Sequence, residues 1–493
     1  MGGTGVQTRE KLYIGGEWVA PAGTGTIDVI SPFTEQVIAR VPDGTTADID
    51  RAVAAARTAF DEGPWPRMTP QERAGYLGQL SALIQSRMDD WAALITSEVG
   101  APFGFSQMGQ VFASTMVMDY YVGLANSFHF EEVRQGVMGP ALIQREALGV
   151  AGAIVPWNVP LFTTALKLAP AFIAGCTMVL KPAPETPLDA YLLAEACEEI
   201  GLPNGVLNIV VAGREVSEHL VRHPDVDKIG FTGSTAAGRR IASVAGEGLK
   251  RVTLELGGKS ASIFLPDADL SVAVPQALGS GFMNNGQACV AQTRVLVSRD
   301  KYDETVDALV DFTRNQVVGD PMDPATQIGP LVAERQRERV EGYIAKAQSE
   351  GNKIAVGGGR PSGQPTGWFV EPTLVLDVEP NHTIAQEEVF GPVVSVIAYD
   401  TPEDAVRIAN DSAYGLSGSV FTADVAAGID IARQVRTGTY TVNSFALEFA
   451  GPFGGYKSSG VGRELGPEGL SAYLESKSIS LPAGTEVPGV PVV

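Results

Sequence analysis

The chain has 493 residues, which is enough for roughly three domains of about 150 residues each. Its composition, 44% hydrophobic and 19% charged, is typical of a globular protein rather than of a disordered tail or a fibre. The formal net charge of −21 argues against nucleic acid or an anionic membrane surface as a partner, because both are polyanions.

Two segments near the start, 48–59 and 71–84, have apolar residues at helical spacing, and the first hundred residues are expected to be mainly helical. From Gly149 onward, short apolar runs alternate with helical segments. This alternation predicts parallel strands joined by crossover helices, in a sheet that is covered on both faces. A sheet of this kind is typical of a dinucleotide-binding domain. A second alternating series begins near Ala261 and predicts a second α/β domain with its own sheet.

Two further segments are expected to lie outside these sheets. Residues 128–145 are predicted to form a hairpin that protrudes between helical segments, and the C-terminal segment is predicted to be an extended strand followed by a tail. A strand at an exposed edge usually needs a partner. The extended C-terminal segment is therefore expected to pair with the hairpin or with a neighbouring subunit.

The compartment is inferred from two features. No signal-peptide pattern is present, and the apolar stretch 161–180 is interrupted by Lys167, Pro170 and Gly175, so no uninterrupted membrane span is expected. Three cysteines make an odd number and a low density, which favours a reducing compartment over a disulfide scaffold. We therefore expect a cytoplasmic protein.

Cys289 is the candidate nucleophile. It lies in the run NNGQACVAQTR, where Gly286 and Ala288 would let a substrate approach the sulfur. The alternative is a buried inert thiol, which is the usual role of a free cysteine. Cys176 and Cys197, predicted at a strand edge and in a helix, are assigned that structural role.

Two polar residues could support such a nucleophile. Glu255 ends a strand-like run just before Gly257, at the edge of the sheet where α/β ligands bind, and a partly desolvated carboxylate there can activate water. Asn158 lies between Pro156 and Pro160, which restrict the backbone, and a fixed amide can donate to an oxyanion. The alternatives are an ion-paired carboxylate and an ordinary turn asparagine.

A nucleotide site is suggested by two strand ends. The standard G-x-G-x-x-G pattern is missing, but Gly233 and Ser234 follow a strand-like run and precede a helix, where backbone amides and a hydroxyl can bind phosphate. Lys181 ends another predicted strand of the same sheet and could reach a ribose or a phosphate. Together these residues favour a bound nucleotide.

Seven motifs extend this interpretation to nearly the whole chain: PWNVP, LKPAPETP, FTGSTAAGR, LELGGKS, GQACVAQTR, EEVFGPV and PFGGYKSSGVGRE. Their order and spacing resemble those of the aldehyde dehydrogenase superfamily. The resemblance implies an α/β fold with a Rossmann-type parallel-sheet cofactor domain, an α/β catalytic domain and a β-hairpin oligomerisation element. The corresponding ranges are 1–127 with 146–256 for dinucleotide binding, 257–472 for catalysis, and 128–145 with 473–493 for oligomerisation.

The same resemblance implies roles for individual residues. Cys289 would be the nucleophile, Glu255 the general base and Asn158 the oxyanion donor. The residues implied in cofactor binding are Lys181 at the adenosine ribose, Gly233 and Ser234 at the pyrophosphate, Glu388 at the nicotinamide ribose, and Phe390, Trp157 and Gly257 in the cofactor cleft. Lys167 and Glu464 match positions associated with a proton path, and the predicted substrate pocket consists of Phe162, Thr163, Leu166 and Phe453. No metal is implied.

The implied reaction is oxidation of an aldehyde to a carboxylic acid with reduction of NAD(P). It proceeds through a thiohemiacetal and a thioester on Cys289, and water activated by Glu255 hydrolyses the thioester. NAD is the expected cofactor because no arginine is expected beside the site. NADP is not excluded, since Pro184 replaces a glutamate that many NAD-preferring members carry.

The substrate and the assembly are predicted more broadly. No arginine occurs among the four pocket residues, so a neutral aliphatic or aromatic aldehyde is expected. The alternatives are an NADP-preferring semialdehyde dehydrogenase, a cysteine-dependent esterase or acyl hydrolase, and a non-catalytic relative. An esterase of this type usually pairs its thiol with histidine, and only His382 lies near a motif. Association into a homodimer or a homotetramer is expected from the resemblance.

Overall fold

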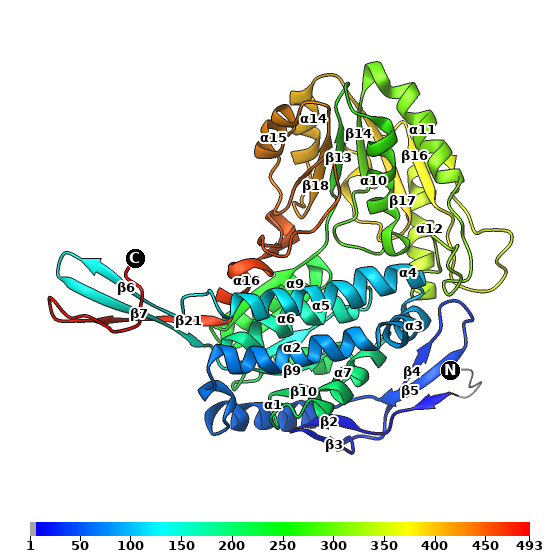
Figure 1. Ribbon diagram of the computed structural model, residues 1–493. Coiled ribbons are helices and arrows are strands. Elements are labelled where there is room, and N and C mark those ends of the chain that lie inside the picture. Colours follow the sequence, from blue (N-terminus) through cyan, green and yellow to red (C-terminus); the bar gives the residue numbers. More distant parts are fainter. Residues whose placement is uncertain (1–5) are drawn as a thin grey trace.

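Two open β-sheets, one in each of two lobes, form the framework of the protein (Figure 1). The computed structural model describes residues 6–493, so the first five residues of the predicted cofactor domain lie outside this range. A three-stranded arm projects from the lobe that holds the N-terminal half of the chain (Figure 1).

The first lobe is built on an eight-stranded sheet with the order β20-β12-β11-β8-β9-β10-β2-β3. Its strands from β12 to β10 are parallel, whereas β20, β2 and β3 pair in antiparallel fashion. The strands are β2 (Leu12–Ile14), β3 (Glu17–Val19), β8 (Val150–Ile154), β9 (Thr177–Lys181), β10 (Leu207–Ile209), β11 (Lys228–Thr232), β12 (Arg251–Glu255) and β20 (Gly460–Val461). Every residue of β8, β9 and β11 is buried, because helices cover both faces. This confirms the predicted parallel sheet.

Helices cover this sheet on both faces. They are α1 (Thr46–Asp61), α2 (Pro70–Ser86), α3 (Met88–Val99), α4 (Phe103–Phe105), α5 (Ala113–Leu124), α6 (Pro160–Ala174), α7 (Leu188–Glu199), α8 (Arg214–Arg222) and α9 (Thr235–Glu247). The start of α2 illustrates how local sequence sets a helix end. The Thr69 hydroxyl accepts a hydrogen bond from the Glu72 amide at 3.2 Å, and the Glu72 carboxylate accepts one from the Thr69 amide at 2.7 Å.

The second lobe contains a seven-stranded sheet with the order β15-β16-β17-β14-β13-β18-β19. All neighbours are parallel except the β15 and β16 pair. The strands are β13 (Ala261–Phe264), β14 (Arg294–Ser298), β15 (Lys353–Val356), β16 (Thr373–Leu376), β17 (Val393–Tyr399), β18 (Gly418–Phe421) and β19 (Thr441–Val442). The helices of this part of the chain are α10 (Leu270–Phe282), α11 (Tyr302–Arg314), α12 (Glu334–Ser349), α13 (Thr383–Gln386), α14 (Pro402–Asn410), α15 (Val425–Gln434) and α16 (Gly466–Ser471). The second alternating series therefore does have its own sheet, as predicted.

The expectation of a mainly helical first hundred residues was wrong. Residues 7–42 contain β2, β3 and the separate sheet β1-β5-β4, formed by β1 (Gln7–Thr8), β4 (Thr26–Ile30) and β5 (Val37–Pro42). These strands are short and several are half-exposed. They therefore lack the alternation of apolar and polar residues by which a strand is predicted from sequence.

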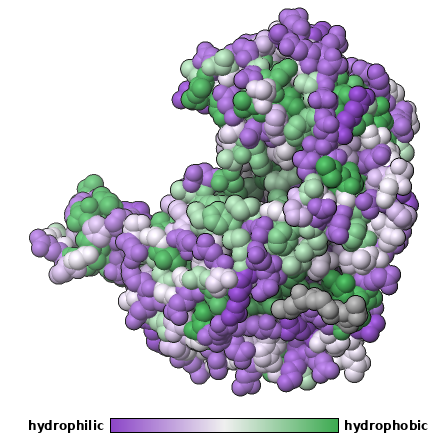
Figure 2. Space-filling model, turned by 45° about the vertical axis from the view of Figure 1, so that its right-hand side comes forward, coloured by the Kyte–Doolittle hydropathy of each residue, from purple (hydrophilic) through white to green (hydrophobic). Residues whose placement is uncertain are grey.

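The projecting arm consists of β6 (Glu131–Gly136), β7 (Gly139–Ala147) and β21 (Leu474–Ser480). β7 pairs in antiparallel fashion with both neighbours, so the hairpin and the C-terminal strand form one sheet within the chain. The tail returns to the free edge of β6, where Val133 bridges to Val492. Figure 2 shows apolar side chains near the end of the arm, and Val137 and Met138 in its turn are exposed.

Candidate active site

A cavity of about 230 Å³ lies between the two lobes, at the carboxyl ends of β8, β11 and β12. A hollow between the lobes is visible in Figure 2. Nine residues predicted for the site line this cavity: Trp157, Asn158, Thr163, Gly233, Ser234, Gly257, Cys289, Glu388 and Phe390. Residues far apart in the sequence are therefore brought together at one edge of the first sheet.

A tight turn presents Cys289 to the cavity. Asn284, Asn285 and Gly286 have positive φ angles of 52°, 61° and 73°. A Cβ atom on Gly286 would lie 2.1 Å from the carbonyl carbon of Gly391, so no side chain fits there. The Asn285 side chain secures the turn, because it donates to the Gly100 and Pro330 carbonyls and accepts from the Gly329 amide. Cys289 then follows in a half-buried position.

The surroundings of Cys289 disfavour its thiolate form. Burial, with the Glu388 and Glu255 carboxyl groups nearby, raises the pKa of Cys289 to about 12. Burial also raises the pKa of Cys176 to about 11 and that of Cys197 to about 12, and both thiols are enclosed in the core. Only Cys289 lines the cavity, and it needs a base before it can act as a nucleophile.

Asn158 is tied to the turn that carries Cys289. Its side-chain Nδ2 donates to the Gln287 carbonyl at 2.8 Å, and its backbone carbonyl accepts from Asn284 Nδ2 at 2.8 Å. An amide nitrogen carries two hydrogens. Only one of them has a partner among residues 6–493, so the other can serve an oxygen in the cavity.

Glu255 lies behind the cavity rather than in its wall. Its neighbours Leu256 and Gly257 line the cavity, while the Glu255 carboxylate lies against Gly454, where a Cβ atom would be 2.6 Å from Oε1. Neither carboxylate oxygen has a hydrogen-bond partner in the described part of the chain. Burial, followed by the charge of Glu464, raises the pKa of Glu255 well above its usual value. A buried carboxyl group without a partner is costly to keep, and such groups gather at functional sites.

Lys167 and Glu464 form a buried pair whose charges act on Glu255. Lys167 Nζ lies 2.9 Å from Glu464 Oε1 and donates to Thr232 Oγ1 at 2.6 Å. Thr232 lines the cavity, and the charges of Glu464 and Lys167 both act on Glu255. Lys167 therefore contacts a residue of the cavity wall, and the proton path through Lys167 and Glu464 stays a prediction.

Arg339 on α12 holds the segment that carries Glu388 and Phe390. Arg339 donates through Nη2 to the Glu388 carbonyl at 2.6 Å and through Nε to the Val389 carbonyl at 3.2 Å. The Glu388 carboxylate accepts from the Gly258 amide at 2.8 Å, and burial raises the pKa of Glu388 to about 7. The Phe390 ring packs edge-on against Trp157, with 5.4 Å between the ring centroids.

A second cavity, of about 340 Å³, contains Lys181 and shares Ser234 with the first. Its apolar wall consists of Ile154, Val221, Phe231, Ile241 and Val244. Arg214 and Arg240 also line it, so the expectation that no arginine lies beside the lysine was wrong. Both arginines are remote from Lys181 in sequence and reach it only because β9, β10 and β11 end at the same edge of the sheet.

The four residues predicted for the substrate pocket lie in different surroundings. Thr163 lines the first cavity, but Phe162, Leu166 and Phe453 do not. Leu166 and Phe453 belong to the core of the first lobe, and Phe162 packs against that core.

Sequence reasoning missed Arg339, Gln336 and Arg214. Gln336 and Arg339 line the first cavity from α12, whose sequence ERQRERVEGYIAKAQS is polar and matches no motif.

Among the described residues, no group of three or more His, Cys, Asp or Glu side chains could hold a metal ion, and no helix is long and apolar enough to cross a membrane.

The family model described as "Aldehyde dehydrogenase family" matches residues 18–479. The chain belongs to this family. It is an oxidoreductase of the aldehyde dehydrogenase type, with the corresponding α/β fold. Geranial dehydrogenase of Castellaniella defragrans is 43% identical over 473 residues, which cover 96% of this chain and 98% of that enzyme. A 3-succinoylsemialdehyde-pyridine dehydrogenase of Pseudomonas is 43% identical over 474 residues, covering 95% of this chain and 98% of that enzyme.

Solved structures give the same family. Mycobacterium tuberculosis aldehyde dehydrogenase, in complex with NAD⁺, matches with a TM-score of 0.96 and 50% identity, covering 98% of this chain and 100% of that one. A mutant of aldehyde dehydrogenase C from Pseudomonas syringae, in complex with NAD⁺ and octanal, matches with a TM-score of 0.93 and 41% identity, covering 97% and 98% of the two chains.

Proposed function

We propose that this aldehyde dehydrogenase oxidises a neutral aliphatic or aromatic aldehyde to the carboxylic acid, with NAD⁺ as the hydride acceptor. One observation carries the proposal. A half-buried thiol, Cys289, lines a cavity that adjoins a second cavity suited to a nucleotide, and the unpartnered carboxyl group of Glu255 lies behind the first. Two similar structures contain NAD⁺, which supports the choice of cofactor.

The residues present fit a dinucleotide. Glu388, Phe390, Trp157 and Gly257 line the first cavity and would hold the nicotinamide riboside. Ser234 precedes α9, where the amides of the helix start suit a pyrophosphate, and the apolar wall of the second cavity suits adenine. When bound, the nicotinamide ring supplies the hydride acceptor that the oxidation requires.

The chain's own residues perform the remaining chemistry. Glu255 takes the proton of the Cys289 thiol and releases it through Glu464 and Lys167. The sulfur bonds to the aldehyde carbon, and the resulting oxyanion accepts a hydrogen bond from Asn158 Nδ2. After oxidation to the thioester, Glu255 takes a proton from water, whose oxygen then attacks the acyl carbon. The C–S bond breaks, and the acid leaves. Lys167 and Glu464 would pass the proton from Glu255 toward Thr232.

The substrate is inferred from the charges of the cavity. Arg339 is the cationic side chain that lines it, and two backbone carbonyls already occupy this guanidinium. A substrate carboxylate would therefore find no cationic side chain among the lining residues that is free to pair with it. The relatives named for geranial and crystallised with octanal also point to a neutral aldehyde. No histidine lines the cavity, which disfavours the cysteine-dependent esterase.

The test separates the two half-reactions. Cys289→Ala should abolish aldehyde oxidation, whereas Glu255→Gln should form one equivalent of reduced nicotinamide per active site and then stall, because the thioester is no longer hydrolysed. Rapid-mixing absorbance measures both, and Cys197→Ala, which alters a core thiol, should retain full turnover. Unimpaired steady-state rates in Glu255→Gln would contradict the proposal.

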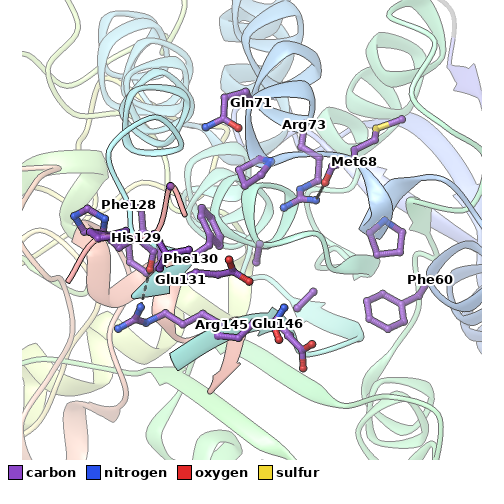
Figure 3. Close-up of a pocket in the computed structure, with 18 residues that line it drawn as sticks. Phe60, Met68, Gln71, Arg73, Phe128, His129, Phe130, Glu131, Arg145 and Glu146 are labelled. Carbon is purple, nitrogen blue, oxygen red and sulfur yellow. Dashed lines mark hydrogen bonds between the residues drawn. The ribbon is translucent and has the colours of Figure 1, made fainter. Parts of the chain in front are cut away.

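We also propose that the arm joins the chain into a cytoplasmic homodimer or homotetramer. The exposed Val137 and Met138 at its turn are suited to burial against another subunit. A cavity of about 820 Å³ opens at the base of the arm, where Phe128 and His129 lie across from Phe60 and Met68 (Figure 3). The nucleophile must also remain a free thiol, which suits a reducing compartment. Light scattering of Val137→Asn/Met138→Gly against the native protein tests the assembly, since a monomeric native protein would refute it.

A further inference from the structure

Lys228, the first residue of β11, is a buried lysine that the proposed reaction does not yet use. Its side chain is only 1% exposed. Its Nζ donates to Thr253 Oγ1 at 2.7 Å and lies 4.5 Å from the centre of the Tyr473 ring. Among residues 6–493 no carboxylate forms an ion pair with it. A buried ammonium is costly unless a nearby negative charge compensates it, so the source of that charge matters.

The strand register puts Lys228 on the same face of the sheet as the proposed base. Side chains alternate between the two faces of a strand, so Lys228, Gly230 and Thr232 share one face of β11. β12 pairs with β11 so that Thr253 lies beside Gly230 and Glu255 beside Thr232. One face of the two strands therefore leads from Lys228 at its start to Glu255 at the end near the cavity.

The glycine in the middle of this face makes room for two larger side chains. A Cβ atom on Gly230 would lie 3.3 Å from Tyr473 Oη and 3.4 Å from Lys167 Cδ. Lys167 in turn contacts Glu464 Oε1 through its Nζ at 2.9 Å. The other oxygen, Glu464 Oε2, has no hydrogen-bond partner in the described part of the chain. The pair of Lys167 and Glu464 thus packs over the face that Lys228 shares.

Glu464 supplies the negative charge that Lys228 needs. Burial lowers the pKa of Lys228 to about 8, and the charge of Glu464 opposes this effect, while that of Lys167 adds to it. The Cys176 thiol also faces Lys228, but burial raises its pKa to about 11, so it is uncharged near neutral pH. Two ammonium groups therefore share one carboxylate. The other carboxyl group on this face is that of Glu255.

We propose that Lys228 is a positioning residue for proton transfer, because its charge, added to that of Lys167, keeps Glu464 in the carboxylate form that can accept a proton from Glu255. The inference rests on the proposed function, in which Glu255 is the base. The proton leaves a carboxyl oxygen of Glu255 and bonds to Glu464 Oε2, the oxygen without a partner. A second cation favours the carboxylate of Glu464 over its acid form, which has no place for that proton.

The experiment measures kcat between pH 6 and pH 9.5 with NAD⁺ and octanal, the aldehyde present in one similar structure. Lys228→Met removes the charge and keeps a long side chain. Loss of a nearby cation moves the ionisation of a carboxyl group to higher pH by about one unit. The variant should therefore be about tenfold slower than the native enzyme at the acidic end and within about twofold of it above pH 9. Lys228→Gln should show the same shift, and Lys228→Arg should restore most of the native profile.

Two controls separate this charge from its surroundings. Lys250, just before β12, is half-buried and donates to the His223 carbonyl, so Lys250→Met removes a lysine from the same region and should leave the pH profile unchanged. Thr253→Val removes the hydroxyl that Lys228 contacts but keeps the ammonium, and should shift the profile little.

A double variant tests whether Lys228 acts through Glu464. In a Glu464→Gln background, Lys228→Met should cause no further shift, because the carboxylate that the ammonium favours is gone. A uniform fall in kcat at every pH in both neutral variants would indicate a packing role and overturn the inference, while turnover of the native enzyme leaves the proposed function intact. An equal shift in Lys250→Met would also overturn it. A native protein without aldehyde oxidation would refute the proposed function itself.

Discussion

Lys167 Nζ lies 2.9 Å from Glu464 Oε1, and both side chains are buried. The pair joins α6 to the segment just before α16, 297 residues away in the chain. A buried pair contributes little net stability, but removal of one partner leaves the other charge without compensation. The charges of both partners also act on Glu255, the residue that we propose as the base.

Replacement of Lys167 alone should strongly reduce the stability of the folded protein. Lys167→Met leaves Glu464 buried without its cation, and we expect the free energy of unfolding to fall by about 3 to 5 kcal/mol. The double variant Lys167→Met/Glu464→Met removes both charges and should recover most of this loss. Urea unfolding followed by tryptophan fluorescence compares the three proteins. If the single and double variants were equally unstable, the loss of stability would come from the changed packing volume and not from the uncompensated charge.

The reactivity of Cys289 should depend steeply on pH. Its pKa is raised to about 12 by burial and then by Glu388 and Glu255, so the thiolate fraction, and with it the rate of alkylation by iodoacetamide, should rise about tenfold per unit between pH 7 and 10. Glu388→Gln removes a negative charge that exists only above its own pKa of about 7. The variant should therefore react faster than the native protein above pH 7 and equally below it.

Cys289→Ala provides the control for this labelling. Cys176 and Cys197 are buried, with the pKa of each thiol raised by burial, so the folded variant should incorporate no label. Mass spectrometry of the labelled peptide assigns the site. A plateau in the rate of the native protein below pH 9 would contradict the environment described for Cys289.

The residues that could be predicted from the sequence are those next to the ends of strands. Lys181, Ser234 and Glu255 each end or follow a strand-like run, and parallel strands in one sheet bring such positions together. The small residues around Cys289 predict that a substrate can approach its sulfur. The left-handed turn at Asn284, Asn285 and Gly286 could not be predicted in the same way, because only the glycine favours that conformation.

Residues that reach the site through tertiary packing could not be predicted in this way. Arg339 lies in a polar helix of the second lobe and Arg214 starts a helix of the first, and nothing local distinguishes them from solvated arginines. The substrate-pocket residues stay a prediction. Phe162 packs against the core of the first lobe, as Cys289 does, and Leu166 lies within that core.

Arg339 should act as a positioning residue for the Glu388 segment. It bonds two carbonyls of a segment in which Phe390 has a φ of 64°, a conformation that costs a side-chain-bearing residue roughly 1 to 2 kcal/mol. Arg339→Ala should raise KM for the cofactor about tenfold, with a smaller change in kcat. Tyr343→Phe removes the hydroxyl that donates to Glu387 at 2.7 Å and accepts from Arg339 Nη2 at 3.3 Å. It leaves both carbonyl contacts of Arg339 in place and should have a smaller effect. Equal changes in both variants would argue against the carbonyl contacts as the cause.

A buried carboxyl pair should make stability depend on pH. Glu98 on α3 accepts from the Leu188 amide at 3.0 Å, while Glu98 Oε1 and Asp189 Oδ1 have no partner among the described residues. Burial raises the pKa of both carboxyl groups, that of Asp189 to about 7. The folded protein thus retains a proton that the unfolded chain releases near pH 4. The stability from this proton is complete below pH 4 and is lost as the pH rises toward 7.

Asp189→Asn should remove the share of this dependence that comes from Asp189, because the amide is neutral at every pH, while Glu98 keeps its own share. Relative to the native protein, the variant should gain at least about 1 kcal/mol between pH 5 and pH 8, since one pKa unit corresponds to about 1.4 kcal/mol. Thermal unfolding midpoints at the two pH values measure the difference. Asp430→Asn, at a carboxylate whose side chain is 70% exposed, is the matched control and should follow the native protein. A native-like pH profile for Asp189→Asn would show that Asp189 is ionised in the folded protein despite its burial.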